Sequence, residues 1–425
     1  MLKTDEKYTA YLQVLRNHLR PAMGCTEPIA IAYAAATAVN ALGKIPERAE
    51  VLASGNIIKN ARSVTVPNTG GKKGIEAACA AGIFAGDASK ELQVISCVSK
   101  EQQAQIEMFL QKNAITVDVK PDARLFDILV TVYNGQDVAS ARIADRHTNV
   151  VTVSKNGEAL TTGALGDENQ ACDPNEALLR IEDIFDFANS CELSQISDLL
   201  DKQIELNRRI AHEGMEHCWG ACVGRVLLES NDATDVRVRA KAYAAAGSDA
   251  RMSGCELPVM INSGSGNQGI TVSVPLIEYA EGMQLPKEQL HRALLLSNLT
   301  AIRLKALIGC LSAYCGAISA GCASAAGIAY LLGGDLHLIS HTLVNSLAIL
   351  SGTICDGAKP SCAAKIACAI DAGIMGYQMA LQDKEFRGGE GIVKKGVENT
   401  IISIGRLGKD GMRETDREIL KIMVG

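Results

Sequence analysis

A change of residue pattern along the chain constrains its fold more than any other feature. Between about residues 47 and 155, β-branched and alternating runs such as AEVLASG, FDILVTVYN and NVVTVS follow one another, with two helical stretches between them. Alternating apolar residues indicate strands with one buried face. Before this block and after about residue 160, apolar residues recur at helical spacing, with abundant alanine and glycine that permit close helix packing. The fold class that we expect is therefore α+β.

The order of these patterns also predicts the domain organisation. We expect residues 1–45 and 160–425 to form a mainly helical, catalytic bundle. Residues 46–159 are expected to form a small α+β domain with a mixed sheet, inserted into that bundle. A chain of 425 residues is long enough for two domains with separate cores. An insertion is the simplest architecture, since no repeat or flexible linker stands out in the sequence.

Composition narrows the class of function. The chain is 47% hydrophobic and 21% charged, which is an ordinary profile for a soluble globular protein. Its net charge of −6 and single Trp argue against nucleic-acid partners and against a negatively charged membrane surface. The N-terminal segment is charged and amphipathic, unlike a signal peptide. We expect a cytoplasmic protein whose partner is a small-molecule substrate, and the aliphatic helical surface is compatible with a homodimer.

Cysteines are the side chains that most suggest chemistry. The chain has 14, and in a reducing compartment they are expected to be free thiols or metal ligands. Two pairs have the same spacing of seven residues, Cys315 with Cys322 and Cys355 with Cys362. Three thiolates that converge on one point suit an iron–sulfur cluster with one open iron, which can act as a Lewis acid. Buried cysteines that act only as small apolar residues are the alternative, and spacing alone leaves both open.

A further cysteine, Cys25, lies in the motif Gly-Cys-Thr-Glu-Pro, directly before an apolar stretch that reads as a buried helix. Proline is well tolerated in the first turn of a helix. The positive end of a helix lowers the pKa of a nearby thiol, so this position favours a reactive thiolate. A cysteine in an ordinary capped turn is the alternative.

The segment 262–269, NSGSGNQG, has the composition of a substrate loop. Its three glycines allow backbone N–H groups to converge into an anion nest suited to a carboxylate. It follows two apolar residues, so we favour a buried substrate site over a structural turn. The side chains that would add hydrogen bonds there are those of Ser263, Ser265, Asn267 and Gln268. The similar segment 66–74, VPNTGGKKG, is interpreted instead as a loop that opens a helix.

Four motifs together, GCTEP, SGNIIKNARSV, SGSGNQGI and CDGAKPSC, resemble the L-cysteine desulfidase (CyuA-type) family over essentially the whole chain. The second half also resembles the alpha domain of iron–sulfur L-serine dehydratases. The resemblance implies a [4Fe-4S] cluster held by three cysteines, with one iron free to engage an amino acid. The ligands carry over as Cys355 and Cys362 plus Cys315, with Cys322 and Cys310 remaining open in place of Cys315.

The same resemblance implies a role for Cys25 and a reaction. Cys25 corresponds to the family's N-terminal cysteine, a candidate catalytic base or an additional iron ligand. The implied activity is that of a carbon–sulfur lyase, which converts L-cysteine to pyruvate, ammonia and sulfide by non-redox β-elimination. Iron–sulfur serine dehydratases are thought to place a C-terminal cysteine on the free iron. The last cysteine of this chain is Cys368, and this difference favours desulfidase over dehydratase.

Three alternatives compete with this interpretation. The first is an iron–sulfur L-serine dehydratase. The second is a pyridoxal-phosphate lyase, because GSGNQG resembles the SGNxG carboxylate loop of cysteine-synthase-like enzymes. Such enzymes carry a Ser-x-Lys-x-Arg motif upstream, but the nearest lysine here, Lys241, lies in a plain helical stretch. The third is a non-enzymatic, cysteine-rich redox sensor, against which the buried glycine-rich loop argues.

Overall fold

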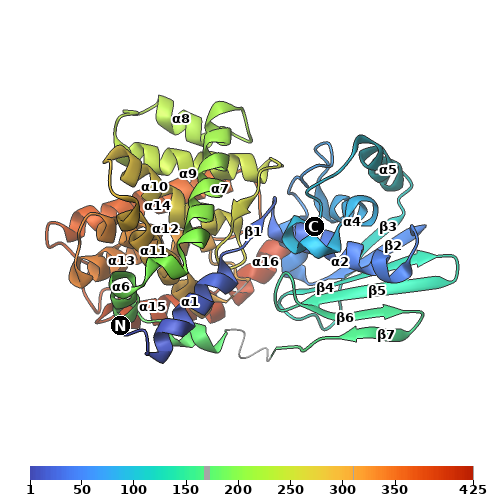
Figure 1. Cartoon of the computed structure of the whole chain (residues 1–425), viewed down its shortest axis with the longest axis horizontal. Coiled ribbons are helices and arrows are strands. Elements are labelled where there is room, and N and C mark those ends of the chain that lie inside the picture. Colours follow the sequence, from blue (N-terminus) through green and yellow to red (C-terminus); the bar gives the residue numbers. More distant parts are fainter. Residues whose placement is uncertain (167–172, 310, 425) are drawn as a thin grey trace.

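The structure, a computed structural model, describes residues 1–166, 173–309 and 311–424. A larger helical body and a smaller body built on a mixed sheet lie side by side (Figure 1). This arrangement confirms the expected α+β fold class, a helical bundle combined with a mixed-sheet unit. Within the described ranges, no helix is long and apolar enough to cross a membrane.

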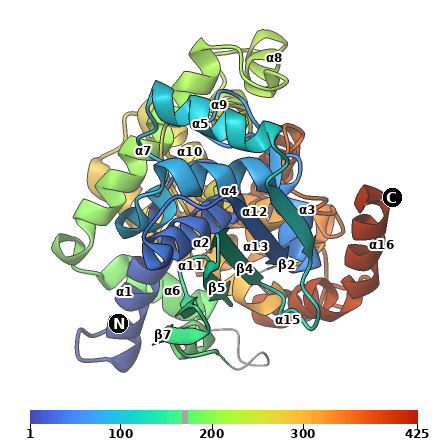
Figure 2. The ribbon, with the colours of Figure 1, turned by 90° about the vertical axis from the view of Figure 1, so that its right-hand side faces the viewer.

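The smaller body contains a six-stranded sheet. In spatial order the strands are β3 (Ile115–Val119), β2 (Arg48–Ala53), β4 (Asp127–Asn134), β5 (Asp137–Ala144), β6 (Val150–Lys155) and β7 (Glu158–Thr162). The β2–β3 pair is parallel and the other pairs are antiparallel. Burial alternates along most of β4, as the sequence pattern predicts for a strand with one covered face. Helices α2 (Thr26–Leu42) and α4 (Gly74–Ala85) pack together on the sheet, and α5 (Lys100–Gln111) packs on α4 (Figure 2).

The larger body is a bundle around α12 (Gly316–Leu331), which contacts α10, α11, α13 and α14. Small residues allow these helices to approach closely: a Cβ on Gly321 would lie 2.6 Å from the Cβ of Ala369. The other helices are α1 (Glu6–His18), α6 (Ile181–Ser190), α7 (Ser197–Glu216), α8 (Val223–Glu229), α9 (Val236–Met252), α10 (Gly266–Gly282), α11 (Lys287–Ile308), α13 (Leu336–Leu350), α14 (Cys362–Ala380), α15 (Val397–Arg406) and α16 (Arg413–Val424).

The two bodies are connected near residues 20–25. The short strand β1 (Pro21–Ala22) pairs antiparallel with β8 (Val259–Met260) of the bundle, and the chain then enters α2. Helix α1 packs on α11, whereas α2 packs on the sheet. At the other end of the chain, α16 contacts α3 (Gly55–Ala61). The expected division into residues 1–45 with 160–425, and 46–159, stays a prediction.

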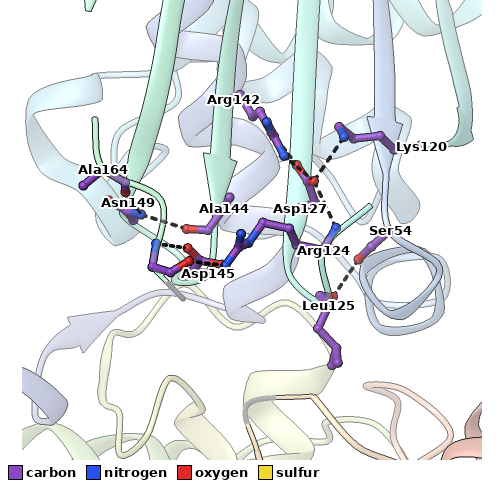
Figure 3. Close-up of polar contacts among 11 residues, drawn as sticks. Ser54, Lys120, Arg124, Leu125, Asp127, Arg142, Ala144, Asp145, Asn149 and Ala164 are labelled. Carbon is purple, nitrogen blue, oxygen red and sulfur yellow. Dashed lines mark hydrogen bonds and ion pairs between the residues drawn. The ribbon is translucent and has the colours of Figure 1, made fainter. Parts of the chain in front are cut away.

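A buried carboxylate orders the end of the sheet where β4 begins and β5 ends (Figure 3). Asp127 accepts two hydrogen bonds from the Arg142 guanidinium, at 2.9 and 2.8 Å, and pairs with Lys120 at 3.1 Å. Burial alone would raise the pKa of Asp127, but these cations lower it below its ordinary value. Nearby, the Arg124 Nε donates to Asp145 at 2.6 Å. These contacts fix the turn after β5, which carries His147.

Close packing of α7 against α9 gives a test of the bundle. A Cβ on Gly214 of α7 would lie 1.9 Å from the carbonyl oxygen of Ala246, whereas a Cβ on Gly247 of α9 would meet its neighbours at 3.4 Å or more. We expect Gly214→Ala to destabilise the protein by about 1–3 kcal/mol through overpacking. The matched Gly247→Ala variant should be neutral or slightly stabilising, because alanine favours helix. Thermal unfolding of both variants measures this, and equal melting temperatures would contradict the packing described.

Candidate active site

Two of the expected cluster ligands are brought together by a short antiparallel contact between segments 313–315 and 353–355. The Cys355 N–H donates to the carbonyl of Ala313 at 2.6 Å, and the Cys315 N–H donates to the carbonyl of Thr353 at 3.1 Å. Cys315 is also the N-cap residue of α12. The pairing places the two side chains next to each other, and their thiols interact through a hydrogen bond.

The third expected ligand, Cys362, is the first residue of α14. Its Sγ lies 3.7 Å from the carbonyl oxygen of Gly357. Burial raises the pKa of Cys362, and the negative charge of a Cys355 thiolate raises it further. Cys362 packs against a small apolar cluster that includes Cys25. Residues that are far apart in the sequence therefore meet at this point.

Of the two alternative ligands, Cys322 lies within the buried core of α12. Burial raises its pKa to about 12, which is typical of a cysteine that acts as a small apolar side chain. The geometry thus favours Cys315, rather than Cys322, beside Cys355. Cys310 lies outside the described residues.

The surroundings of Cys355 are positively charged. The hydrogen bond from Cys315 has the largest effect on the pKa of Cys355 and lowers it. Burial raises this pKa, but the charges of Lys59 and Lys305 lower it further. The resulting pKa of Cys355 is about 6. Lys365 lies near as well, with its Nζ 2.8 Å from the carbonyl of Ile354. Cationic side chains stabilise thiolates, which are the form that binds metal.

We tested whether this donor set fits a metal. Among the described residues, no three His, Cys, Asp or Glu side chains lie close enough to hold a single ion. A cluster has a different requirement, because each thiolate binds a different iron and the sulfurs are spread around it. Cys315, Cys355 and Cys362 influence one another's pKa, and no disulfide joins them. Three thiols in a cationic setting fit an iron–sulfur cluster and not a mononuclear site.

Cys25 lies at the start of α2, as the sequence predicted, and the structure makes it the N-cap residue. Its expected low pKa is wrong for the surroundings that the structure shows. Burial raises the pKa of Cys25 well above its ordinary value, and the Glu27 carboxylate adds to this. The Cys25 Sγ–H donates to Glu27 Oε2 at 3.0 Å. Because the Cys25 side chain is buried, removal of the thiolate from water raises its pKa by more than the helix dipole lowers it.

The glycine-rich loop 262–269 leads into α10 next to these thiols. Ser265 is the N-cap residue of α10, and the Gln268 N–H donates to its Oγ at 3.5 Å. The Ser263 hydroxyl donates to Asn262 Oδ1 at 2.8 Å, so both serine side chains hold the loop itself. The side chain of Gln268 lies against Gly316, where a Cβ would be 2.9 Å from its amide. Since Gly316 follows Cys315, the loop and the thiol pair are neighbours.

The N-terminal motif is tied to the same loop. The Thr26 hydroxyl donates to the carbonyl of Gly264 at 2.8 Å. Gly24 has a positive φ of 55°, and a Cβ there would lie 2.5 Å from Pro67 of the 66–74 segment. Asn60, in the SGNIIKNARSV motif, donates its side-chain N–H to Glu27 Oε1 at 3.1 Å. All four sequence motifs therefore surround one site, at the junction of the two bodies.

Comparisons with known proteins agree with this geometry. The family model described as "Serine dehydratase alpha chain" matches residues 89–421. The chain belongs to the serine dehydratase alpha chain family. This confirms the relation to serine dehydratases that the C-terminal half suggested, while the desulfidase resemblance stays a proposal.

Relatives that match over nearly their full length extend the similarity. A UPF0597 protein of Desulfitobacterium hafniense is 54% identical over 100% of this chain and 98% of its own length. A UPF0597 protein of Finegoldia magna is 47% identical over 97% of this chain and 99% of its own. One of Lachnoclostridium phytofermentans is 44% identical over 98% of this chain and 100% of its own.

The structure adds two residues that the sequence did not reveal, Arg251 and His147. Arg251, at the end of α9, is 2% exposed, and its guanidinium occupies the place where a side chain on Gly266 would be, with Nε 2.2 Å from the ideal Cβ. The His147 ring lies against Gly264 in the same way, with Cε1 at 2.9 Å. The glycines were a signal for both, since they mark places where other groups approach the backbone closely.

These groups create a compact set of opposite charges. Burial raises the pKa of Glu27, but its interactions with His147, Cys25 and Arg251 outweigh burial and lower this pKa below its ordinary value. Burial in turn lowers the pKa of His147. Arg251 Nη1 donates to Asn267 Oδ1 at 3.0 Å. Buried polar atoms normally have partners. Here several have none within the described residues, namely Asn60 Oδ1, His147 Nε2, Arg251 Nε and Gln268 Oε1. Their concentration is typical of a site that binds a polar ligand.

The Thr26 contact provides a test of how the site is assembled. We expect Thr26→Val to leave the Gly264 carbonyl without its donor, at a cost of about 1–3 kcal/mol, and so to loosen loop 262–269. Hydrogen–deuterium exchange of the loop amides should become faster. Thr26→Ser keeps the hydroxyl and serves as the control, with exchange close to that of the wild type. Unchanged loop exchange in the valine variant would show that this contact does not hold the loop.

Proposed function

We propose that this chain is an iron–sulfur-dependent lyase, and specifically an L-cysteine desulfidase that forms pyruvate, ammonia and sulfide. The observation that carries the proposal is the pairing of Cys315 with Cys355 beside Cys362, next to a glycine-rich loop and within a family named for serine dehydratase. The four-motif resemblance to cysteine desulfidases supports L-cysteine as the substrate.

In this proposal Cys315, Cys355 and Cys362 hold a [4Fe-4S] cluster. When bound, the cluster supplies a Lewis acid that stabilises the departing heteroatom. The hydrogen bond from Cys315 and the charges of Lys59 and Lys305 lower the pKa of Cys355, as metal binding requires. The pKa of Cys315 is raised by its contact with Cys355 and that of Cys362 by burial, so cluster binding would release the protons of these two thiols. Cys25 packs against Cys362, and it keeps the two roles that the resemblance implies, catalytic base or additional ligand.

The protein's own residues bind and orient the substrate. Loop 262–269 receives the carboxylate at the start of α10, where Asn267 is held by Arg251 and Gln268 lies against Gly316, beside the thiols. The site is enclosed between the two bodies: Cys25, Asn262 and Gln268 are all buried. Exclusion of water strengthens the electrostatic interactions that hold a charged substrate. A base then removes the Cα proton and the Cβ–S bond breaks, which releases sulfide and leaves aminoacrylate. Aminoacrylate tautomerises to an imine, which reacts with water to give pyruvate and ammonia.

Serine dehydration is the second candidate function, because the family is named for it. The pyridoxal-phosphate alternative has less support. Lys241 pairs with Asp371 of α14 at 2.7 Å, and it lies ten residues before Arg251 on α9, roughly 15 Å along the helix. A cytoplasmic location, the lack of nucleic-acid and membrane partners, and a homodimer stay predictions.

The ligand assignment is tested by iron and sulfide analysis of anaerobically purified variants. We expect Cys315→Ala, Cys355→Ala and Cys362→Ala each to lose most of the bound iron and the activity. Cys322→Ala is the matched control, because Cys322 is also buried in α12 but only packs there, and it should keep the wild-type iron content. Full iron content in the first three variants would overturn the assignment. Iron loss in the Cys322, Cys355 and Cys362 variants, with full iron content in the Cys315 variant, would move the third ligand to Cys322.

The reaction is tested by turnover of the iron-loaded protein with L-cysteine and L-serine, followed as pyruvate in both cases and as sulfide with L-cysteine. We expect kcat/KM to be higher for L-cysteine, because a soft thiolate binds iron more readily than an alcohol does. A higher value for L-serine would make the protein a dehydratase. Turnover that depends on added pyridoxal phosphate would replace the cluster mechanism.

A further inference from the structure

Two buried, oppositely charged side chains flank Cys25. Glu27 accepts the Cys25 thiol hydrogen bond at 3.0 Å, and Arg251 interacts electrostatically with Cys25, Glu27 and Cys362. The two come from different bodies, since α2 packs on the sheet and α9 belongs to the bundle. Charges are seldom buried unless they are paired or bind something charged. A ligand for this place should therefore carry both signs.

The Arg251 side of the site suits a carboxylate. Arg251 Nε is buried and has no hydrogen-bond partner among the described residues. The guanidinium lies directly over Gly266, the first residue of α10, and Nη1 holds Asn267. The first N–H groups of a helix point out of its N-terminus and favour an anion. A carboxylate there receives hydrogen bonds from the helix and from a fixed cation.

The Glu27 side suits an ammonium group. Glu27 Oε1 accepts a hydrogen bond from Asn60 Nδ2 at 3.1 Å, which holds the carboxylate in place. Asn60 Oδ1 and Gln268 Oε1 are buried acceptors without a partner in the described part of the chain. An ammonium has three N–H donors and no acceptor, so one anionic and two neutral oxygens match its needs.

We propose that Arg251, with the N-terminus of α10, binds the α-carboxylate of the substrate, and that Glu27, with Asn60 and Gln268, binds its α-ammonium group. This assignment rests on the proposed function, because it takes the substrate to be an amino acid. It makes the site selective for zwitterions: a ligand that lacks either end leaves one buried charge without its partner. Together with the heteroatom directed toward Cys355 and Cys362, the two ends give three points of attachment, which fix the L configuration.

Binding by two series of ligands tests the proposal on the cluster-loaded protein. The first series is L-cysteine, cysteamine (no carboxylate) and 3-mercaptopropionate (no ammonium). The second is L-serine, ethanolamine and 3-hydroxypropionate, in which oxygen replaces sulfur. We expect titration calorimetry to show that the wild type binds each amino acid about 100-fold more tightly than either of its truncated analogues.

Variants of Arg251 and Glu27 then test which end of the amino acid each residue binds. In Arg251→Met, affinity for the amino acid should fall about 100-fold while affinity for the analogue without a carboxylate hardly changes. In Glu27→Gln, affinity for the amino acid should also fall, while affinity for the analogue without an ammonium group hardly changes. Each comparison is between the affinities of one variant for two ligands, so a general loosening of the fold affects both affinities and cancels. If Arg251→Met fails to fold, Arg251→Lys replaces it. Arg239→Met is the matched control, since Arg239 lies on the same helix but pairs with Glu278, and it should keep the wild-type selectivity.

The outcomes separate this inference from the proposed function. If the Arg251 variant weakens L-cysteine and cysteamine equally, Arg251 has a structural role and the assignment is overturned, whatever reaction occurs. If the charge selectivity follows the assignment but L-serine is the better substrate, the zwitterion site stands and the desulfidase proposal fails. Equal binding of all six ligands to the wild type would overturn the assignment as well.

Discussion

The antiparallel pairing of segments 313–315 and 353–355 determines where chemistry can occur in this protein. Two backbone hydrogen bonds join the ends of helices that belong to different parts of the bundle and place Cys315 beside Cys355. Backbone contacts position thiols more firmly than side-chain packing does, because the Cβ atoms follow directly from the main chain. The loop 262–269 and Cys362 are then arranged around this pair by the packing of α10, α12 and α14.

Glycines join the motifs to one another. A Cβ on Gly357, in the CDG segment, would lie 2.4 Å from the carbonyl of Lys59, so this segment packs directly on α3. Gly264 and Gly266 admit His147 and Arg251 in the same manner. Glycine-rich sequences are often interpreted as phosphate or carboxylate loops. In this site they also allow two charged or polar side chains from other elements to reach the loop backbone.

Electrostatics links the thiols to the junction between the two bodies. Lys59 lies on α3, pairs with Asp416 of α16, and lowers the pKa of Cys355. The C-terminal helix thus neutralises part of the positive charge near the thiols. On the bundle side, Lys365 pairs with Asp356 at 2.6 Å, and the charge of Lys305 also lowers the pKa of Cys355. The cluster that we propose, held by three thiolates, would be anionic and would need such cations because its charge would be enclosed. The same enclosure raises the pKa of Cys25, whose thiol donates to Glu27.

The sequence by itself determined the α+β fold class, the helical period of the bundle, the position of Cys25 at the start of a helix and the loop before α10, because these follow from local periodicity and helix-start signals. It also singled out Cys355 and its neighbours as candidate ligands. The sequence preferred Cys315 to Cys322 but left Cys322 open, and only the tertiary structure shows the backbone pairing that places Cys315 beside Cys355. It also revealed Arg251 and His147, and reversed the expected pKa shift of Cys25. Burial and contacts between distant segments decide these properties, and neither is encoded in any local stretch of residues.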